Sequence, residues 1–244
     1  MNKSALLVIA VSVACGSKDA NAQASAPIST DRPSFSASPF TLKPGVWQIE
    51  SGYQYTRDDD SDTTLQTFPQ ALLRFGLSDE IELQFGWPGI SRRDDGSSSD
   101  SGMTDAAVIM KIQLTEDTAA TPVSFLAGVS LPIGDSEFSS DKYDPVIGAA
   151  WAHSRFFGMA LIIRSDGDYD FQNGIGASFA LKNNMSAFAE WQASIPENGG
   201  SVHQLNGGLL WARQSNVQWD LNLSLGLNDR APDFSIGGGF SYRF

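Results

Sequence analysis

Cysteine, basic residues and long apolar runs are all scarce in this 244-residue sequence. Cys15 is the single cysteine, so no disulfide framework can stabilise the chain. Lys and Arg total 16 against 28 Asp and Glu, a net charge of −12, which does not suit non-specific nucleic-acid binding. The longest largely apolar stretch, Ala5 to Ala14 with Ser12 inside it, is shorter than the roughly 20 residues of a membrane-spanning helix. A β-barrel membrane protein is still allowed, because its alternating strands keep the average hydropathy low.

The N-terminus has the features of a secretory signal peptide over residues 1–22. Lys3 precedes the apolar run, and Ala20-Asn21-Ala22 fits a small-x-small cleavage site. Cleavage after Ala24 and lipid attachment at Cys15 remain alternatives, although Ser12 stands where a lipoprotein motif prefers a Leu-like residue. With ordinary cleavage, the chain is exported and the mature protein has no cysteine.

From Trp47 onward the sequence alternates with a period of two. In Val217 to Leu227 every odd position is apolar and every even position is polar or glycine. Such alternation means that one face of each strand meets an apolar medium and the other meets polar surroundings. A soluble β-sandwich would also alternate, so the strand count and the connections are needed to decide.

The segments with this pattern number twelve, and each is close to the roughly 9–11 residues that a tilted strand needs to cross a bilayer. Their connections alternate between tight turns and longer, Ser/Asp-rich stretches at 57–63, 89–102 and 134–143. Outer-membrane barrels have short periplasmic turns and longer outer loops, so both termini would be periplasmic. The predicted strands are 45–57, 64–77, 81–88, 103–114, 122–133, 144–152, 156–164, 169–181, 185–195, 202–212, 217–228 and 233–244.

Aromatic residues on the predicted outer face gather near the two ends of the strands, as the girdles of a membrane barrel do. Those near the turns are Trp47, Phe75, Phe125, Trp151, Phe157, Phe179, Trp211, Trp219 and Tyr242. Those near the loops are Tyr55, Phe85, Trp87, Phe171 and Phe234. We therefore predict an all-β fold: a transmembrane, antiparallel, up-and-down β-barrel of twelve strands over residues 45–244.

The predicted lumen has two kinds of wall. One is charged and amide-rich, and its candidate lining residues are Glu50, Gln54, Arg74, Glu82, Gln84, Asp105, Lys111, Glu190, Asp220 and Arg243. The other consists mostly of small residues: Gly128, Ser130, Gly148, Ala150, Gly174, Gly176, Ser178, Gly237 and Gly239. The mixed charges could form a structural ladder that partly closes the pore, or could line a solute path. Residues 23–44, rich in proline, could be a periplasmic extension or a lumenal plug.

Several short motifs occur before and within the predicted strands: Thr30-Asp31-Arg32-Pro33, Pro39-Phe40, Pro44-Gly45, Phe75 to Leu83, Gly102 to Asp105 and Leu131 to Gly134. In combination they resemble a family of outer-membrane transporters associated with the meta-pathway of phenol degradation, whose pattern has Thr at the position of Ile133. The last strand, ending at Phe244, also resembles the signal by which barrel-insertion machinery recognises its substrates. The resemblance spans residues 28–244 and implies transport, with aromatic compounds as candidate substrates.

The combined prediction is a passive outer-membrane channel for small solutes, aromatic or hydrophobic compounds among them, that contacts lipid and lipopolysaccharide and no nucleic acid. The first alternative is a structural barrel with a plugged lumen. The second is an outer-membrane lipase using Ser201 with His203, or Ser154 with His153, but both pairs lack a clear third orienting group. We expect no enzyme activity, cofactor or metal. Asp166-Gly-Asp168-Tyr-Asp170 has the opening spacing of a calcium loop but lacks its later Gly and Glu.

Overall fold

The computed structural model describes residues 27–165 and 167–244. The predicted signal peptide, both candidate cleavage sites and Cys15 lie outside the described residues. In the described part of the chain, no helix has the length and apolar character needed to cross a membrane.

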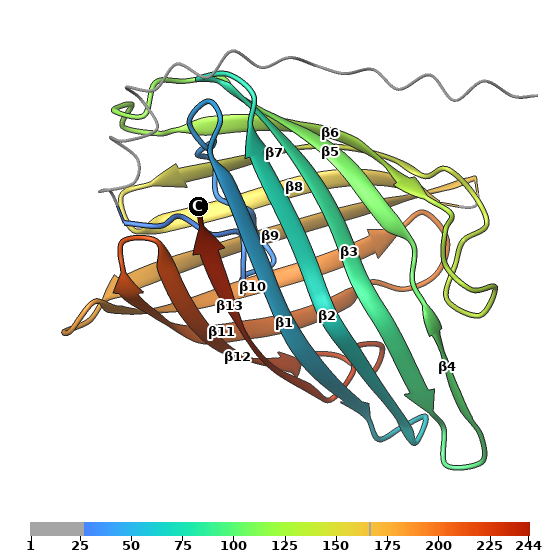
Figure 1. The fold of residues 1–244 in the computed structure, drawn as a ribbon. Coiled ribbons are helices and arrows are strands. Elements are labelled where there is room, and N and C mark those ends of the chain that lie inside the picture. The colour runs from blue at the N-terminus through green and yellow to red at the C-terminus, as the bar shows by residue number, and fades with distance from the viewer. Residues whose placement is uncertain (1–26, 166) are drawn as a thin grey trace, which may run out of the picture.

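One antiparallel sheet, closed on itself, forms the described fold (Figure 1). Consecutive strands pair, except that β4 and β5 both pair with β3. The first strand pairs with the last over Gln48–Arg57 and Phe234–Arg243, which closes the barrel. The strands are β1 (Trp47–Asp58), β2 (Thr63–Gly76), β3 (Ile81–Asp94), β4 (Ser99–Met103), β5 (Ala106–Gln113), β6 (Val123–Leu131), β7 (Pro145–His153), β8 (Phe156–Ser165), β9 (Asp168–Ala180), β10 (Met185–Pro196), β11 (Val202–Gln214), β12 (Val217–Gly226) and β13 (Phe234–Arg243).

The predicted twelve-stranded barrel is confirmed, because β4 and β5 are two parts of one wall strand that both pair with β3. The predicted loop at 89–102 is wrong. There β3 continues to Asp94 and pairs with β4, from Ile90 with Met103 to Asp94 with Ser99. This hairpin extends beyond the apolar belt at the loop end, so neither of its faces needs apolar residues. Its polar sequence therefore looked like a loop.

A bulge interrupts β2 at Pro69 and Gln70. The pairing of β1 with β2 shifts between Glu50 and Gln54, and Gln70 has a positive φ of 42°. A bulge suits proline, which has no N–H to donate to the ladder. Because the bulge inserts a residue, Phe68 faces outward with 60% of its surface exposed, whereas Gln70 lies in the lumen.

The polarity of the two faces is the reverse of that in a soluble protein. Leu221 is 62% exposed and Ile175 is 54% exposed on the outside, whereas Glu50, Arg74 and Lys111 are fully buried inside. A continuous apolar outer surface of this size requires a lipid environment. The fold is that of a membrane-spanning β-barrel.

Two residues predicted for the outer aromatic girdles face inward instead. Phe157 packs its ring against the buried Phe188, with centroids 6.3 Å apart, while its neighbour Phe156 faces out. Because the two phenylalanines are adjacent and equally apolar, the alternation pattern cannot show which of them faces outward. Trp87 lines a lumenal cavity, because the pairing of β3 with β5 and β4 is interrupted at that point.

We predict that an arginine on the outer face destabilises the barrel strongly at mid-strand and only slightly at a turn. Ile175→Arg, near the middle of β9, should lower the free energy of unfolding in lipid vesicles by about 2–4 kcal/mol. Leu181→Arg, in the turn that follows β9, should cost about 0–1 kcal/mol. Denaturant titration followed by the gel mobility of the folded barrel measures both. Equal losses in the two variants would contradict the lipid-facing assignment.

Candidate functional site

Residues 28–44, here called the lumenal segment, are held by carboxylates that project from the barrel wall. Glu50 accepts hydrogen bonds from the backbone N–H of Asp31 (3.0 Å) and of Arg32 (2.8 Å). Glu190 accepts from Phe35 (2.8 Å) and Ser36 (2.9 Å), and Glu82 accepts from Leu42 (2.8 Å). Three strands therefore bind the segment through its backbone, and ionised acceptors make these hydrogen bonds strong.

Five buried charges form one network at this place. The Arg74 guanidinium lies 3.0 Å from Glu50 and 2.8 Å from Glu82, and Lys111 Nζ lies 3.0 Å from Asp31. Three carboxylates face two cations here, and the segment's N–H groups provide the missing positive partial charge. Buried charges are tolerated only when every one is paired and hydrogen-bonded. The strand residues and the lumenal segment therefore depend on each other for their charge partners and hydrogen bonds.

Asp31 belongs to the lumenal segment and carries a perturbed pKa. Burial opposes ionisation of its carboxyl group, but Arg74 and Lys111 outweigh that penalty and lower its pKa from 3.8 to about 2. Gln84 Nε2 adds a hydrogen bond of 2.9 Å to the same carboxylate. Asp31 is therefore ionised throughout the physiological pH range.

The wall of small residues makes room for the segment's side chains. A Cβ atom on Gly52 or Gly239 would overlap the guanidinium of Arg32, which bonds Gln70 (2.9 Å) and Asp220 (3.2 Å). A Cβ on Gly174 would approach Ser36 Oγ to 2.7 Å. Nearby, Phe35 and Ala37 pack on a cluster of inward apolar side chains formed by Leu126, Ala150 and Met159.

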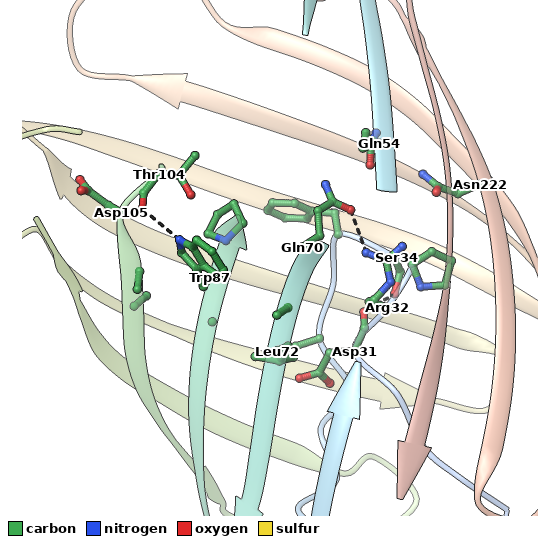
Figure 2. Close-up of a pocket in the computed structure, with 18 of the residues that line it drawn as sticks. Asp31, Arg32, Ser34, Gln54, Gln70, Leu72, Trp87, Thr104, Asp105 and Asn222 are labelled. Atoms are coloured by element: carbon green, nitrogen blue, oxygen red, sulfur yellow. Dashed lines mark hydrogen bonds between the residues drawn. The ribbon is translucent and has the colours of Figure 1, made fainter. Parts of the chain in front are cut away.

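A cavity of about 760 Å³ lies in the lumen beside the segment (Figure 2). One part of its lining is apolar or aromatic and includes Phe35, Leu72, Trp87, Pro88 and Phe138. The other part carries amides, namely Gln54, Gln70, Gln192, Asn206 and Asn222. Asn222 Oδ1 is buried and accepts a hydrogen bond from none of the described residues. The cavity can thus hold an apolar body with a hydrogen-bonding group.

Phe35 also lines a second cavity of about 250 Å³, together with Gln172, Gln192, Ser194 and Gln204. Since Phe35 and Gln192 border both spaces, the two cavities are neighbours. The Phe35 ring thus borders both cavities.

Beside the larger cavity the wall is interrupted on one side of β3, and side chains help to hold it together. β3 pairs with β5 as far as Gly86 and with β4 from Ile90, whereas its pairing with β2 continues through Trp87 and Gly89. Pro88 has no N–H to donate. Trp87 Nε1 donates to the carbonyl of Thr104 (3.1 Å), and Asp105 accepts from the backbone N–H of Gly134 (3.0 Å) and Ser140 (2.9 Å). Figure 2 shows Trp87 extended toward Thr104.

The predicted lumen residues divide by their position in the structure. Those that contact the lumenal segment are Glu50, Arg74, Glu82, Gln84, Lys111, Glu190 and Asp220. Gln54 and Asp105 line the larger cavity, and Arg243 is buried at the turn end, where it donates to the Ser215 carbonyl (3.0 Å). Asp105 and Arg243 therefore stand apart from the five-charge network.

Sequence analysis missed the partners that come from the segment itself: Asp31, Arg32 and Phe35. A signal for them was present. Inward-facing acids outnumbered inward-facing bases in the predicted strands, and the missing cations and N–H donors had to come from outside those strands.

The serine–histidine pairs are arranged differently from each other. Ser201 Oγ lies 2.9 Å from His203 Nε2, but the His203 ring stacks on Trp191 and Asn228 bonds the His203 backbone N–H. His153 Nδ1 bonds Thr121 (2.7 Å) and not the adjacent Ser154. In the possible calcium loop, Asp166 is outside the described residues, and Asp170 accepts from Gln172 and Ser194.

The closed sheet, the apolar exterior and the polar lumen define the class: an outer-membrane β-barrel. Three solved structures share the fold. An outer membrane channel from Pseudomonas putida F1 matches with TM-score 0.59 and 12% identity, over 85% of this chain and 98% of that one. The KdgM porin matches with TM-score 0.52 and 11% identity (81% and 99% coverage), and the NanC porin with 0.50 and 9% (80% and 98%).

The family follows from the sequence. Residues 30–244 match the family model described as "Putative MetA-pathway of phenol degradation", and the chain belongs to that family. The predicted resemblance is thereby confirmed. No curated protein matches the chain.

We predict that Arg74 is essential to the network. Arg74→Met would leave Glu50 and Glu82 buried without their main cation, which should cost about 3–5 kcal/mol of unfolding free energy. Lys43→Met, which removes the more exposed ion pair with Asp117 (3.0 Å), should cost much less. Urea unfolding of both variants in the same detergent compares them. Similar stability of the two variants would show that the buried network contributes little.

The low pKa of Asp31 predicts a particular pH dependence. A carboxyl group with a depressed folded-state pKa stabilises the fold above its unfolded pKa of about 3.9, and that contribution disappears as the pH falls toward about 2. The stability difference between the wild type and Asp31→Asn should therefore be constant from pH 7 to pH 5 and shrink below about pH 4. Unfolding titrations across this range test it. A difference that already shrinks between pH 7 and pH 5 would contradict the assignment.

Proposed function

We propose that this protein is a passive outer-membrane channel for small solutes that combine an apolar or aromatic body with a hydrogen-bonding group. The observation that carries the proposal is the cavity of about 760 Å³ inside a closed membrane barrel, with aromatic and amide linings. Its size suits a small organic molecule. The family is described by phenol degradation, and the similar structures are an outer membrane channel and porins.

We assign three parts to the chain: a signal peptide (1–22), a lumenal plug (23–44) and the barrel (45–244). Removing the plug would take away the backbone N–H groups that donate to Glu50, Glu82 and Glu190, at a cost of several kcal/mol. The plug therefore stays docked while solutes pass beside it, and it narrows the channel.

A structural barrel without transport is the second candidate, favoured by the fully buried charges of Arg74, Glu50 and Glu82. We prefer the channel, because the lumen beside these charges is hollow and lined for a ligand. The non-enzymatic assignment agrees with the similar structures, which are channels and porins.

Two further contacts belong to the same proposal. The acidic outer loops, with Asp58, Asp59 and Asp60 in one of them, would bind divalent cations that bridge to lipopolysaccharide. The strand β13, followed by Phe244, would be recognised by the barrel-insertion machinery.

Solute binding in the lumen can be followed through Trp87. Of the six tryptophans, we assign this one to the larger cavity. A quenching aromatic solute such as nitrophenol should quench the wild-type fluorescence with a saturable component. That component should be lost in Trp87→Phe and kept in Trp151→Phe, whose ring is outside the lumen. If both variants keep the saturable component, the solute binds outside the larger cavity.

Transport itself is measured in planar bilayers and in cells. The wild type should conduct ions through a narrow pore, and a deletion strain should take up aromatic compounds more slowly. Absence of conductance together with normal uptake would reject the channel and leave the structural barrel.

A further inference from the structure

A hollow of about 640 Å³ lies on the outer wall of the barrel, where β1, β12 and β13 meet. Its rim consists of large apolar side chains that are exposed on the lipid side: Tyr53, Phe68, Trp219, Leu221 and Phe240. The hollow is separate from the lumenal cavity described above, and nothing in the proposed transport function uses it.

The hollow arises from one small residue among large ones. Gly238 faces outward between Tyr53 and Leu221, its partners on the two neighbouring strands. A Cβ atom at Gly238 would come within 2.8 Å of Leu221 Cδ2, so a side chain there would push Leu221 aside and project into the hollow. On the far side, the β2 bulge turns Phe68 outward and raises the rim.

A cation lies at the turn end of the hollow. Arg213 is among the lining residues, and its guanidinium lies 5.7 Å from the centroid of the Trp211 ring. The pairing of β11 with β12 shifts between Trp211 and Gln214, beside the short turn. Short turns of outer-membrane barrels face the periplasm, so this arginine lies at the level of the inner-leaflet headgroups.

We propose that the hollow binds a phospholipid of the periplasmic leaflet, with an acyl chain over Gly238 and the phosphate on Arg213. An apolar trough that ends in an exposed guanidinium complements a lipid with an anionic headgroup. Trp211 contributes an aromatic surface at the same interface.

Charge argues against a second copy of the chain as the occupant. A symmetric dimer in a membrane has its two-fold axis along the membrane normal, so the same face of both copies meets at the same depth. The two Arg213 side chains would then be brought together, and like charges repel. A lipid phosphate is negatively charged and would attract Arg213.

Native mass spectrometry of the detergent-solubilised protein with added phosphatidylglycerol tests the proposal. The wild type should retain one lipid per monomer. Arg213→Gln should weaken retention about fivefold, because a cation near a membrane surface contributes about 1 kcal/mol. Gly238→Leu should abolish retention by filling the trough. Arg155→Gln, which removes a cation from the β7–β8 turn away from the hollow, is the matched control and should retain lipid as the wild type does.

Heat-dependent gel mobility verifies that each variant is folded, and a variant that fails is replaced by Arg213→Met or Gly238→Val. Equal retention by all variants overturns the proposal. So does a wild-type dimer that Gly238→Leu converts to monomers, since the occupant would then be a second copy.

Discussion

The neutralisation of charge inside the barrel is the constraint on which the rest of the structure depends. Glu50, Arg74, Glu82 and Lys111 project from adjacent strands into a space that excludes most water, and they need a fixed set of partners. The lumenal segment provides these partners through Asp31 and its backbone N–H groups. The position of the segment then determines the position of Phe35, and so the shape of both cavities. Charge compensation thereby sets the dimensions of the proposed channel.

Small residues on the inner wall of the barrel follow from the same constraint. A lumen with a peptide inside it cannot also contain large side chains on every strand. Gly52, Gly174 and Gly239 are placed where Arg32 and Ser36 come close to the wall. A larger residue at Gly52 or Gly239 would meet the Arg32 guanidinium and displace the segment, and the charges that bind the segment would then lose part of their partners.

The barrel could be predicted from the sequence because its two faces meet media of opposite polarity, which the alternation of Val217 to Leu227 displays residue by residue. Prediction failed where that contrast was missing. The β3–β4 hairpin is polar on both faces, Phe156 and Phe157 are adjacent and equally apolar, and Trp87 lies beside a break in the ladder. Alternation also assigned inward positions, but it could not show which of them bind the segment, because those contacts join residues far apart in the chain.

In the proposed channel, the segment stays in the lumen while solutes pass beside it. A Ser36→Cys, Gly174→Cys double variant tests this most directly, because a Cβ on Gly174 would lie 2.7 Å from Ser36 Oγ and the predicted mature chain has no other cysteine. Solute flux through proteoliposomes should be compared before and after oxidation. We predict that the disulfide forms and that the flux remains unchanged. Flux that stops on oxidation and returns on reduction would show that the segment has to leave the lumen, and would contradict the account.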